Sequence, residues 1–532
     1  MSSIGRASVL IGAGTIASRL TGLLRTIVLV AAIGSIGGAG DAFAVANQLP
    51  NNIYAIISTG LLTAVVVPQI VKAAAHADGG QAFISKLFTL GTVGLLGATA
   101  LAMVAAPLLV QVYASKFTDD QLALSTAFAY WCLPQVFFYG LYALLGEILN
   151  ARRVFGPYTW APIVNNVISI AGFGVFILIF SGPQDRVDAW TPSMIATLAG
   201  TATAGIVVQT LVLLFFWRRA GLTLRPDFQW KGVGLRHIGR LAGWTFLMVV
   251  AGQLAGIVQS NVLSGASGND PAIFVSQNAW LLFMLPYSII VLSIGTPYFT
   301  QLSEHAAAGR HDQVRADISR SIRTLGFFIV ASAAALAVAA VPASRIFTTN
   351  AEQAVAAAPV LLCFLVCLVP LAVLFVVQRT FYAYNDTRTP FFFTLLQCAL
   401  VAGGAVLASA VLDRGELAAG VALTQSIASV VQVVVATVLL HRRLSGIGTA
   451  SWLLALGRFA LAALPAAAAG YGVLLLLGGT DGWTTSSALA GAAGAAIVGS
   501  VVLAVYLGIL ALFRTPELAP ALALGRRFLP HR

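Results

Sequence analysis

The chain has 532 residues, of which 59% are hydrophobic and only 9% are charged. Its mean hydropathy of +0.90 excludes a soluble globular protein and indicates a polytopic membrane protein. The net charge of +12 would suggest nucleic-acid binding only if the basic residues were clustered on one soluble face. They lie in short loops instead, so we expect no nucleic acid to bind. We expect no cleaved signal peptide, because the first apolar run is too long and contains two arginines.

Apolar runs of about 20 residues or more recur along the chain and predict an all-α fold of about fourteen transmembrane helices. Prolines interrupt the second and eighth helices, which is tolerated where a helix lines a cavity. The polar segment 304–320 is expected to form an interfacial amphipathic helix. The predicted helices span 7–34, 41–71, 86–114, 122–150, 157–181, 195–217, 239–263, 271–303, 322–346, 353–383, 390–412, 415–440, 451–477 and 485–513.

The loop charges predict the orientation of the chain in the membrane. One alternating set of loops contains 24 of the 30 Lys and Arg residues, and the opposite set contains four. The other two basic residues lie inside the first helix. Because basic residues concentrate in cytoplasmic loops, both termini are expected to be cytoplasmic, with the protein in the cell membrane.

The chain also contains an internal repeat. Segment 19–29 (RLTGLLRTIVL) resembles 253–263 (QLAGIVQSNVL), 234 residues later, and Pro50 aligns with Pro286, 236 residues later. An even number of helices per repeat gives two parallel six-helix lobes, which typically rock about a central site. Chance similarity between apolar segments is the alternative. The predicted domains are an N-lobe (1–218), a C-lobe (219–441, with a cytoplasmic linker at 219–238), helices 13 and 14 (442–514) and a cytoplasmic tail (515–532).

Arg19 and Arg25 are the charged residues of an otherwise apolar first helix. A charge at the bilayer centre costs about 2.5–3.5 kcal/mol on insertion scales, so both are expected to face a watery cavity and bind an anion. Their spacing sets them about 9 Å apart along the axis and about 120° apart around it, which suits a broad cavity wall. Gln253 and Gln259 take their places in the second half. The alternatives are snorkelling or an ion pair with Asp41, which is also placed to cap the second helix.

Several amide side chains surround the proline bends. Gln48, Asn51 and Asn52 flank the bend of the second helix, and Gln277 and Asn278 hold the matching place in the eighth. Their amides would either satisfy backbone groups freed by the prolines or bind sugar and peptide groups of a substrate. The residues alone do not decide between these roles.

Other polar residues have structural interpretations. Glu147 is expected to form an interfacial ion pair with the arginines at 152–153, with gating as the alternative. Asn165 and Asn166 are expected to join helices by hydrogen bonds, and Asp386 to cap a helix. The sequence contains no phosphate-binding glycine loop, HExxH motif or nucleophile–base grouping, and its four cysteines lie in apolar runs. No catalytic residue, metal or cofactor is therefore predicted.

At these residues the chain resembles the MurJ (MviN) family of lipid II flippases, within the superfamily that includes MATE exporters. The most specific pieces are SRLTGLLR, DAFAVANQLPN with VVVPQIVKA, LNARRVFGPYTWAP and FYAYNDTRTP, in a version similar to actinobacterial members. The resemblance implies two lobes around a cationic cavity and a groove at helices 13 and 14 for a polyprenyl tail. It also implies functional roles for Arg19, Arg25 and Asp41.

The chain departs from better-known relatives in its charges. Those relatives have an arginine and a glutamate in the second helix, where this chain has Tyr54 and Thr59, and another such pair in the eighth, where it has Leu281 and Met284. The cavity is therefore expected to be less charged. Some relatives have a sodium site built with carboxylates, but helices 7 and 11 contain no acid here, so sodium coupling by that route is not expected.

Together these observations predict a flippase, not an enzyme, that moves lipid-linked disaccharide-peptide to the outer leaflet. The pyrophosphate would lie on the two arginines. Expected partners are lipid II, membrane lipids and cell-wall synthesis proteins. The alternatives are a MATE-like multidrug antiporter, a flippase for another polyprenyl-linked saccharide, and an integral transferase; arginines disfavour cation export, and the outward acids lack metal-ligand spacing. The predicted substrate-binding residues are Arg19, Arg25, Asp41, Gln48, Asn51, Asn52, Tyr54 and Asn278.

Overall fold

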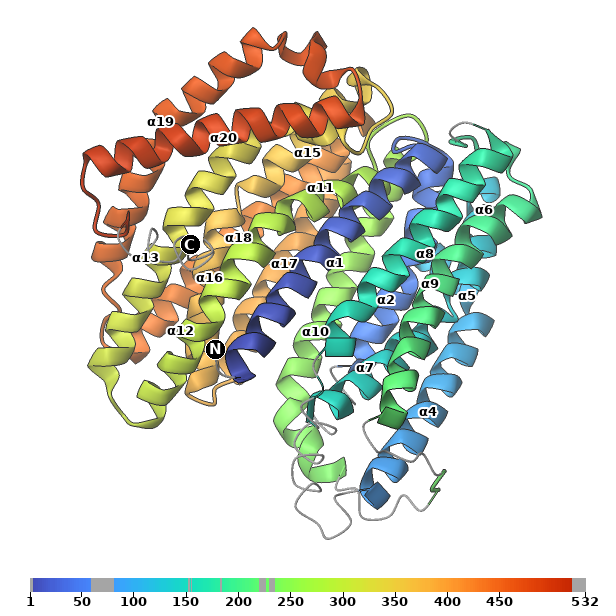
Figure 1. Ribbon diagram of the computed structural model, residues 1–532, viewed down its shortest axis with the longest axis horizontal. Coiled ribbons are helices and arrows are strands. Elements are labelled where there is room, and N and C mark those ends of the chain that lie inside the picture. Colours follow the sequence, from blue (N-terminus) through green and yellow to red (C-terminus); the bar gives the residue numbers. More distant parts are fainter. Residues whose placement is uncertain are drawn as a thin grey trace. The chain divides into compact units, whose positions relative to one another are not determined.

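Helices joined by short connections make up the computed structural model, and its described residues contain no strand (Figure 1). Among the described residues, thirteen helical segments are long and apolar enough to cross a membrane, and they match all the predicted helices except the second. The described part of that helix is α2 (Gly38–Ile57), and the rest of 41–71 lies outside the described residues. The predicted all-α polytopic fold is confirmed. The structure describes residues 3–58, 81–151, 154, 156–181, 184–219, 226–228 and 235–518.

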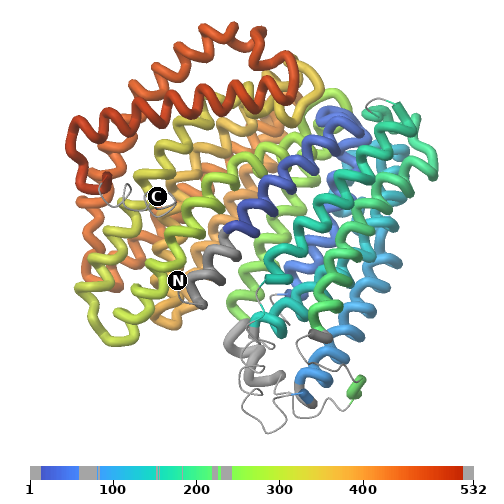
Figure 2. The backbone as a smooth tube through the Cα atoms, viewed as in Figure 1, coloured from blue at the N-terminus to red at the C-terminus, as the bar shows by residue number. Residues whose placement is uncertain are grey.

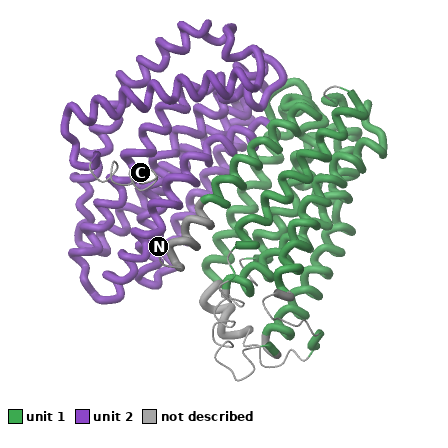
Figure 3. Tube along the Cα trace, viewed as in Figure 1, with its two compact units in different colours: residues 1–274 green, residues 275–532 purple. Residues whose placement is uncertain are grey.

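The chain forms two compact units, residues 1–274 and 275–532 (Figure 3). The predicted lobes, which divide at 218/219, rest on the sequence repeat and stay a prediction. Besides α2, unit 1 contains α1 (Ser3–Ile33), α4 (Gln81–Val104), α5 (Ala106–Tyr113), α6 (Asp119–Cys132), α7 (Gln135–Ala151), α8 (Gly156–Phe180), η2 (Val187–Ala189), α9 (Pro192–Arg219), α10 (Leu235–Leu263) and η3 (Ser264–Ala266).

Unit 2 begins within the first turn of α11 and continues to the end of the chain, and its described helices run from green to red in Figure 2. Its helices are α11 (Ile273–Pro286), η4 (Tyr287–Val291), α12 (Leu292–Ala307), α13 (His311–Val338), α14 (Ala340–Arg345), α15 (Ala351–Leu365), α16 (Leu368–Ala383), α17 (Arg388–Val411), α18 (Arg414–Arg443), α19 (Thr449–Leu476), η5 (Gly479–Asp481), η6 (Trp483–Thr485) and α20 (Ala488–Leu512).

Prolines explain why several predicted spans consist of two helices. A proline lacks the N–H donor and clashes with the carbonyl four residues earlier, so it distorts the preceding turn. The eighth predicted helix changes to a π-helix directly after its first proline. Breaks also fall two to four residues before Pro107, Pro342 and Pro370, and one break contains Pro134 itself.

The predicted interfacial helix at 304–320 is wrong. α12 continues to Ala307, and α13 runs without a break from His311 to Val338. Two polar residues of this segment are paired across the turn between the helices: His305 Nδ1 lies 2.6 Å from Asp317 Oδ2. Such pairing lets a spanning helix continue through a polar stretch at its end.

Aromatic side chains hold the last two helices to α13 in unit 2. Phe327, Phe459 and Tyr506 share one buried cluster, and the Tyr506 hydroxyl donates to the Phe327 carbonyl at 3.0 Å. Large apolar side chains are exposed on the outside of the helices, with Leu178 at 83% and Leu476 at 87%. A surface of this kind suits contact with lipid.

Candidate functional site

Arg19 and Arg25 both lie in α1, where Arg19 is exposed and Arg25 is half-buried. The helix is held to α8 by Asn166, whose Nδ2 donates to the Ser18 carbonyl at 3.1 Å and to Thr21 Oγ1 at 2.9 Å. This contact confirms that Asn166 joins two helices. Among the described residues, no ion pair involves either arginine. α1 therefore carries two guanidinium groups that no described carboxylate neutralises at close range.

Tyr139 of α7 interacts with several of the predicted site residues. Asn51 hydrogen-bonds to the Tyr139 hydroxyl, and Arg25 lies within electrostatic range of it. The Tyr54 and Tyr139 rings lie 5.9 Å apart with an interplanar angle of 36°. Asn51 is exposed, and the two tyrosines are half-buried. Sequence reasoning missed Tyr139, because a tyrosine in an apolar run carries no signal until α2 and α7 pack together.

The other amides of α2 occupy different surroundings. Asn52 Nδ2 donates to the Tyr113 hydroxyl at 3.1 Å, which links α2 to the end of α5. Gln48 is half-buried on the same helix, and Pro50 is accommodated within α2 without ending it. The Asn52 amide thus bonds to a side chain in this structure, and substrate binding by Gln48, Asn51 and Asn52 stays a prediction.

Asp41 is fully buried, and both of its carboxylate oxygens accept hydrogen bonds. Oδ2 accepts from Ser267 Oγ at 2.6 Å, and Oδ1 accepts from the Phe274 amide at 2.8 Å. Gln121 Nε2 in turn donates to Ser267 Oγ at 3.0 Å. We call Asp41, Gln121, Ser267 and Phe274 the Asp41 latch. The carboxylate caps the start of α11, so neither an ion pair with α1 nor capping of α2 describes it.

The latch follows the internal repeat. Asp41 and Phe274 are 233 residues apart, close to the repeat offset. The carboxylate at the start of the second helix therefore caps the start of that helix's counterpart. At the offset of 234 residues the second half has Val275 in place of Asp41. The counterpart helix therefore has no carboxylate that could cap the second helix in the same way.

The end of α10 is tied to the same side of unit 1. Asn261 Nδ2 donates to Ser115 Oγ at 2.8 Å, and the Lys116 amide donates to Ser264 Oγ at 3.3 Å. A cavity of about 370 Å³ lies beside the latch, lined by residues that include Gln121, Asp185 and Ser267. These contacts fix α10 and the start of α11 against α2, α5 and α6 at the predicted outer side.

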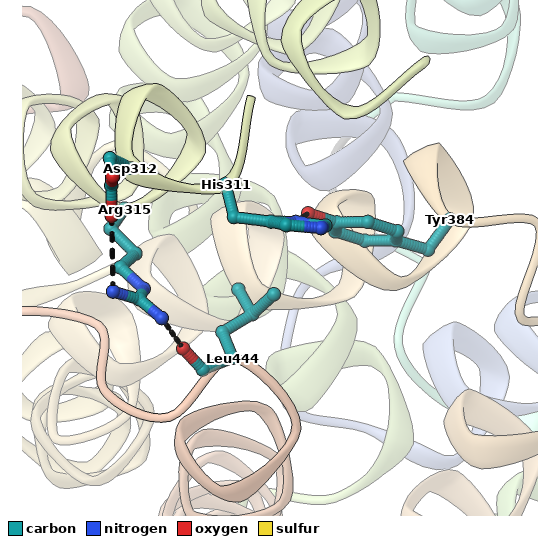
Figure 4. Close-up of polar contacts among 5 residues, drawn as sticks. All are labelled: His311, Asp312, Arg315, Tyr384 and Leu444. Carbon is teal, nitrogen blue, oxygen red and sulfur yellow. Dashed lines mark hydrogen bonds and ion pairs between the residues drawn. The ribbon is translucent and has the colours of Figure 1, made fainter. Parts of the chain in front are cut away.

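A second polar cluster lies in unit 2, at the predicted cytoplasmic side (Figure 4). His311 Nδ1 lies 2.8 Å from the Tyr384 hydroxyl, and the two rings are stacked with centroids 5.9 Å apart. Arg315 donates to Asp312 at 3.2 Å and also to the Leu444 carbonyl. These contacts join the start of α13 to the α16–α17 turn and the end of α18.

Asp386 caps the start of α17, as predicted. It accepts from the Thr389 amide at 2.9 Å and from Thr389 Oγ1 at 2.8 Å, and it pairs with Arg443. Burial raises the pKa of Asp386, but the hydrogen bonds from Thr389 and Arg443 outweigh it and lower the pKa below the ordinary value of 3.8.

Replacing Asp386 with alanine is expected to cost about 1 kcal/mol of stability, because the cap and the ion pair are lost together. Since the folded-state pKa is lowered, this contribution is present above pH 3.8 and disappears as the pH falls through the folded-state pKa. Unfolding in detergent at neutral pH measures it. Asp312→Ala is the matched control, because that side chain is 95% exposed and its ion pair contributes little. Equal losses in the two variants contradict the cap.

The remaining predicted residues lie elsewhere. Asn278 is 95% buried in unit 2 and lines a small cavity there. The predicted partners of Glu147, residues 152–153, lie outside the described residues. The four cysteines carry free thiols.

The fold is that of a polytopic membrane protein, and its helix α1 carries two cations that no described carboxylate neutralises. A lipid II flippase MurJ structure in the inward closed conformation superposes with a TM-score of 0.71 at 19% identity, covering 94% of this chain and 98% of that one. An inward-facing multidrug resistance MATE family transporter of the MOP superfamily superposes with a TM-score of 0.65 at 15% identity, covering 80% and 94%. At these identities the two structures show the shared fold.

Sequence comparison identifies the particular family. The model of the family "Lipid II flippase MurJ" matches residues 30–493. The chain therefore belongs to the MurJ family. It is also 26% identical over 453 residues to a probable lipid II flippase MurJ of Rhizobium tropici, which covers 83% of this chain and 81% of the relative.

Proposed function

We propose that this chain is a lipid II flippase of the cell membrane. It moves the lipid-linked disaccharide-peptide from the inner to the outer leaflet by alternating access, with both termini in the cytoplasm. Membership of the MurJ family supports the substrate. The observation that carries the mechanism is the pair of arginines on α1, which lack a carboxylate partner among the described ion pairs. The lipid is moved without a covalent change.

The pyrophosphate of the substrate matches the chemistry of α1. Guanidinium groups form paired, charge-assisted hydrogen bonds to phosphate oxygens, and these are stronger than neutral ones. Arg25 lies within electrostatic range of Tyr139, which contacts Asn51 and Tyr54. The amide and hydroxyl groups of these three residues suit the sugar and peptide groups next to the pyrophosphate. We assign Arg25 to the pyrophosphate, and Asn51 with the two tyrosines to the adjoining headgroup.

Asp41 has a different part in this proposal. Its carboxylate is occupied by Ser267 and Phe274, so it holds the start of α11 rather than touching substrate. The latch keeps the predicted outer side of unit 1 closed while the substrate loads from the inner leaflet. Outward opening then requires α11 to leave Asp41, at the cost of two hydrogen bonds to a buried charge.

Translocation by the purified full chain in proteoliposomes tests the function. We expect fluorescent lipid II to cross the bilayer, while a fluorescent phospholipid does not. Equal movement of both lipids would indicate an unspecific scramblase. Export of a cationic drug against an ion gradient, without lipid II movement, would instead favour the MATE-like alternative.

Removal of the Tyr139 hydroxyl is expected to slow lipid II translocation about fivefold. Tyr139→Phe keeps the ring but removes one hydrogen bond to Asn51, worth about 1 kcal/mol. Initial rates in proteoliposomes give the effect. Tyr130→Phe, at a 44% exposed tyrosine of α6, is the control and leaves the rate unchanged. A Tyr139→Phe rate equal to that of the control removes Tyr139 from the proposed site.

A further inference from the structure

A small cavity in unit 2 lies between α11 and the turn that joins α14 to α15. Its volume is about 10 Å³, counted as the space open to the centre of a water molecule. Leu282, Phe347 and Ala357 supply apolar wall, and Asn278, Ser344 and Thr348 supply polar groups. A cavity of this size holds about one water molecule.

Asn278 is the polar group that needs a partner in this cavity. Its side chain is 95% buried, and its Nδ2 atom has no hydrogen-bond partner among the described residues. A buried amide donor left without an acceptor is destabilising, so native proteins nearly always supply one, often as ordered water. The cavity is where an acceptor for Asn278 fits.

The opposite wall of the cavity is held in place by Arg345. This arginine is 7% exposed, and it donates to the Thr348 carbonyl and, at 2.8 Å, to the Thr485 carbonyl. Thr348 Oγ1 donates to the Ser344 carbonyl at 3.2 Å. The oxygens of Ser344 and Thr348 are therefore fixed, and Arg345 ties them to the connection between α19 and α20.

We propose that this cavity is a binding site for a single water molecule. The water accepts from Asn278 Nδ2 and donates to Thr348 Oγ1 and to an oxygen of Ser344, which gives it the two to four polar partners that a buried water requires. It thereby joins α11 to the α14–α15 turn and, through Arg345, to the α19–α20 connection. Asn278 lies one turn along α11 from Phe274.

An experimental structure of the full chain at about 2 Å resolution tests the site directly. One water-sized density peak is expected within about 3 Å of Asn278 Nδ2. In Asn278→Leu, which replaces the amide with an apolar side chain, the peak is expected to disappear. A cavity that is empty in the unsubstituted chain, or one filled by a rotated protein side chain, overturns the proposal.

A double-mutant cycle tests the bridge in solution. If one water joins Asn278 and Thr348, the melting-temperature shifts of Asn278→Leu and Thr348→Val do not add, and the double variant departs from their sum by about 2 °C or more. Ser276→Ala is the matched control, because Ser276 Oγ is also buried without a described partner but does not line the cavity. It is expected to add to Thr348→Val.

Additive melting-temperature shifts for Asn278→Leu and Thr348→Val overturn the proposed water bridge.

The melting temperature of the unsubstituted chain in sodium chloride, sodium gluconate and choline chloride tests whether the cavity holds water or a monatomic ion. We expect equal melting temperatures at equal ionic strength, and a loss of stability on removal of chloride or sodium assigns the cavity to that ion instead.

Discussion

Translocation of lipid II is expected to fall at least about 100-fold when Arg19 and Arg25 are both replaced by alanine. Each guanidinium supplies charge-assisted bonds worth about 1.5–3 kcal/mol, and a tenfold change in rate corresponds to about 1.4 kcal/mol. Both side chains lie on a helix that Asn166 holds in place, so alanine removes the charge without releasing α1. Initial rates in proteoliposomes at matched protein density give the effect.

Two controls separate charge from structure in this experiment. Arg19→Lys with Arg25→Lys keeps both positive charges but loses the planar fork, so we expect an intermediate rate. Arg186→Ala removes an exposed arginine of unit 1 that is paired with Asp188 at 2.6 Å, and it is expected to leave the rate unchanged. A fully active alanine double variant contradicts pyrophosphate binding by α1. The family assignment would then stand without this mechanism.

Loss of the Asp41 latch is expected to open the predicted outer side of unit 1. Asp41→Ala leaves the Ser267 hydroxyl and the Phe274 amide without their acceptor and removes two hydrogen bonds to a buried charge. The closed arrangement is then destabilised by about 3 kcal/mol relative to the open one, which lowers the ratio of closed to open molecules about 100-fold. Because alternating access needs a closed outer state, lipid II translocation is also expected to fall, by about tenfold.

A cysteine at position 260 reports this opening. Ser260 is 7% exposed near the end of α10 and its hydroxyl has no partner among the described residues, so Ser260→Cys is a mild substitution. A membrane-impermeant thiol reagent is expected to label it about 10- to 100-fold faster when Asp41→Ala is added. Asp188→Ala, at an exposed residue, is expected to leave labelling unchanged. Equal labelling with and without Asp41→Ala shows that the latch does not hold the outer side closed.

The helices were predictable because apolar runs long enough to cross a bilayer have few other structures available. The prediction was wrong where a polar side chain has a partner on a neighbouring helix. The segment that begins α13 is polar, but Asp317 bonds to His305 at 2.6 Å, and a partner at the end of the preceding helix is not visible in the composition of the segment.

The site was predictable in part for the same kind of reason. A charge in an apolar run is a strong signal, so the sequence singles out Arg19 and Arg25, and their binding of substrate stays a prediction. The partners of Asp41 were not, because Ser267 and Phe274 are ordinary residues 226 and 233 positions away. The grouping at Tyr139 likewise depends on the packing of α7 against α2, which no local pattern encodes.

The position of the pyrophosphate in a structure of the chain bound to lipid II tests the central claim most directly. We expect the phosphate oxygens within about 3 Å of the Arg25 guanidinium, with the sugars beside Tyr54 and Tyr139. A pyrophosphate bound away from α1, with Arg19 and Arg25 directed toward acyl chains, contradicts the account.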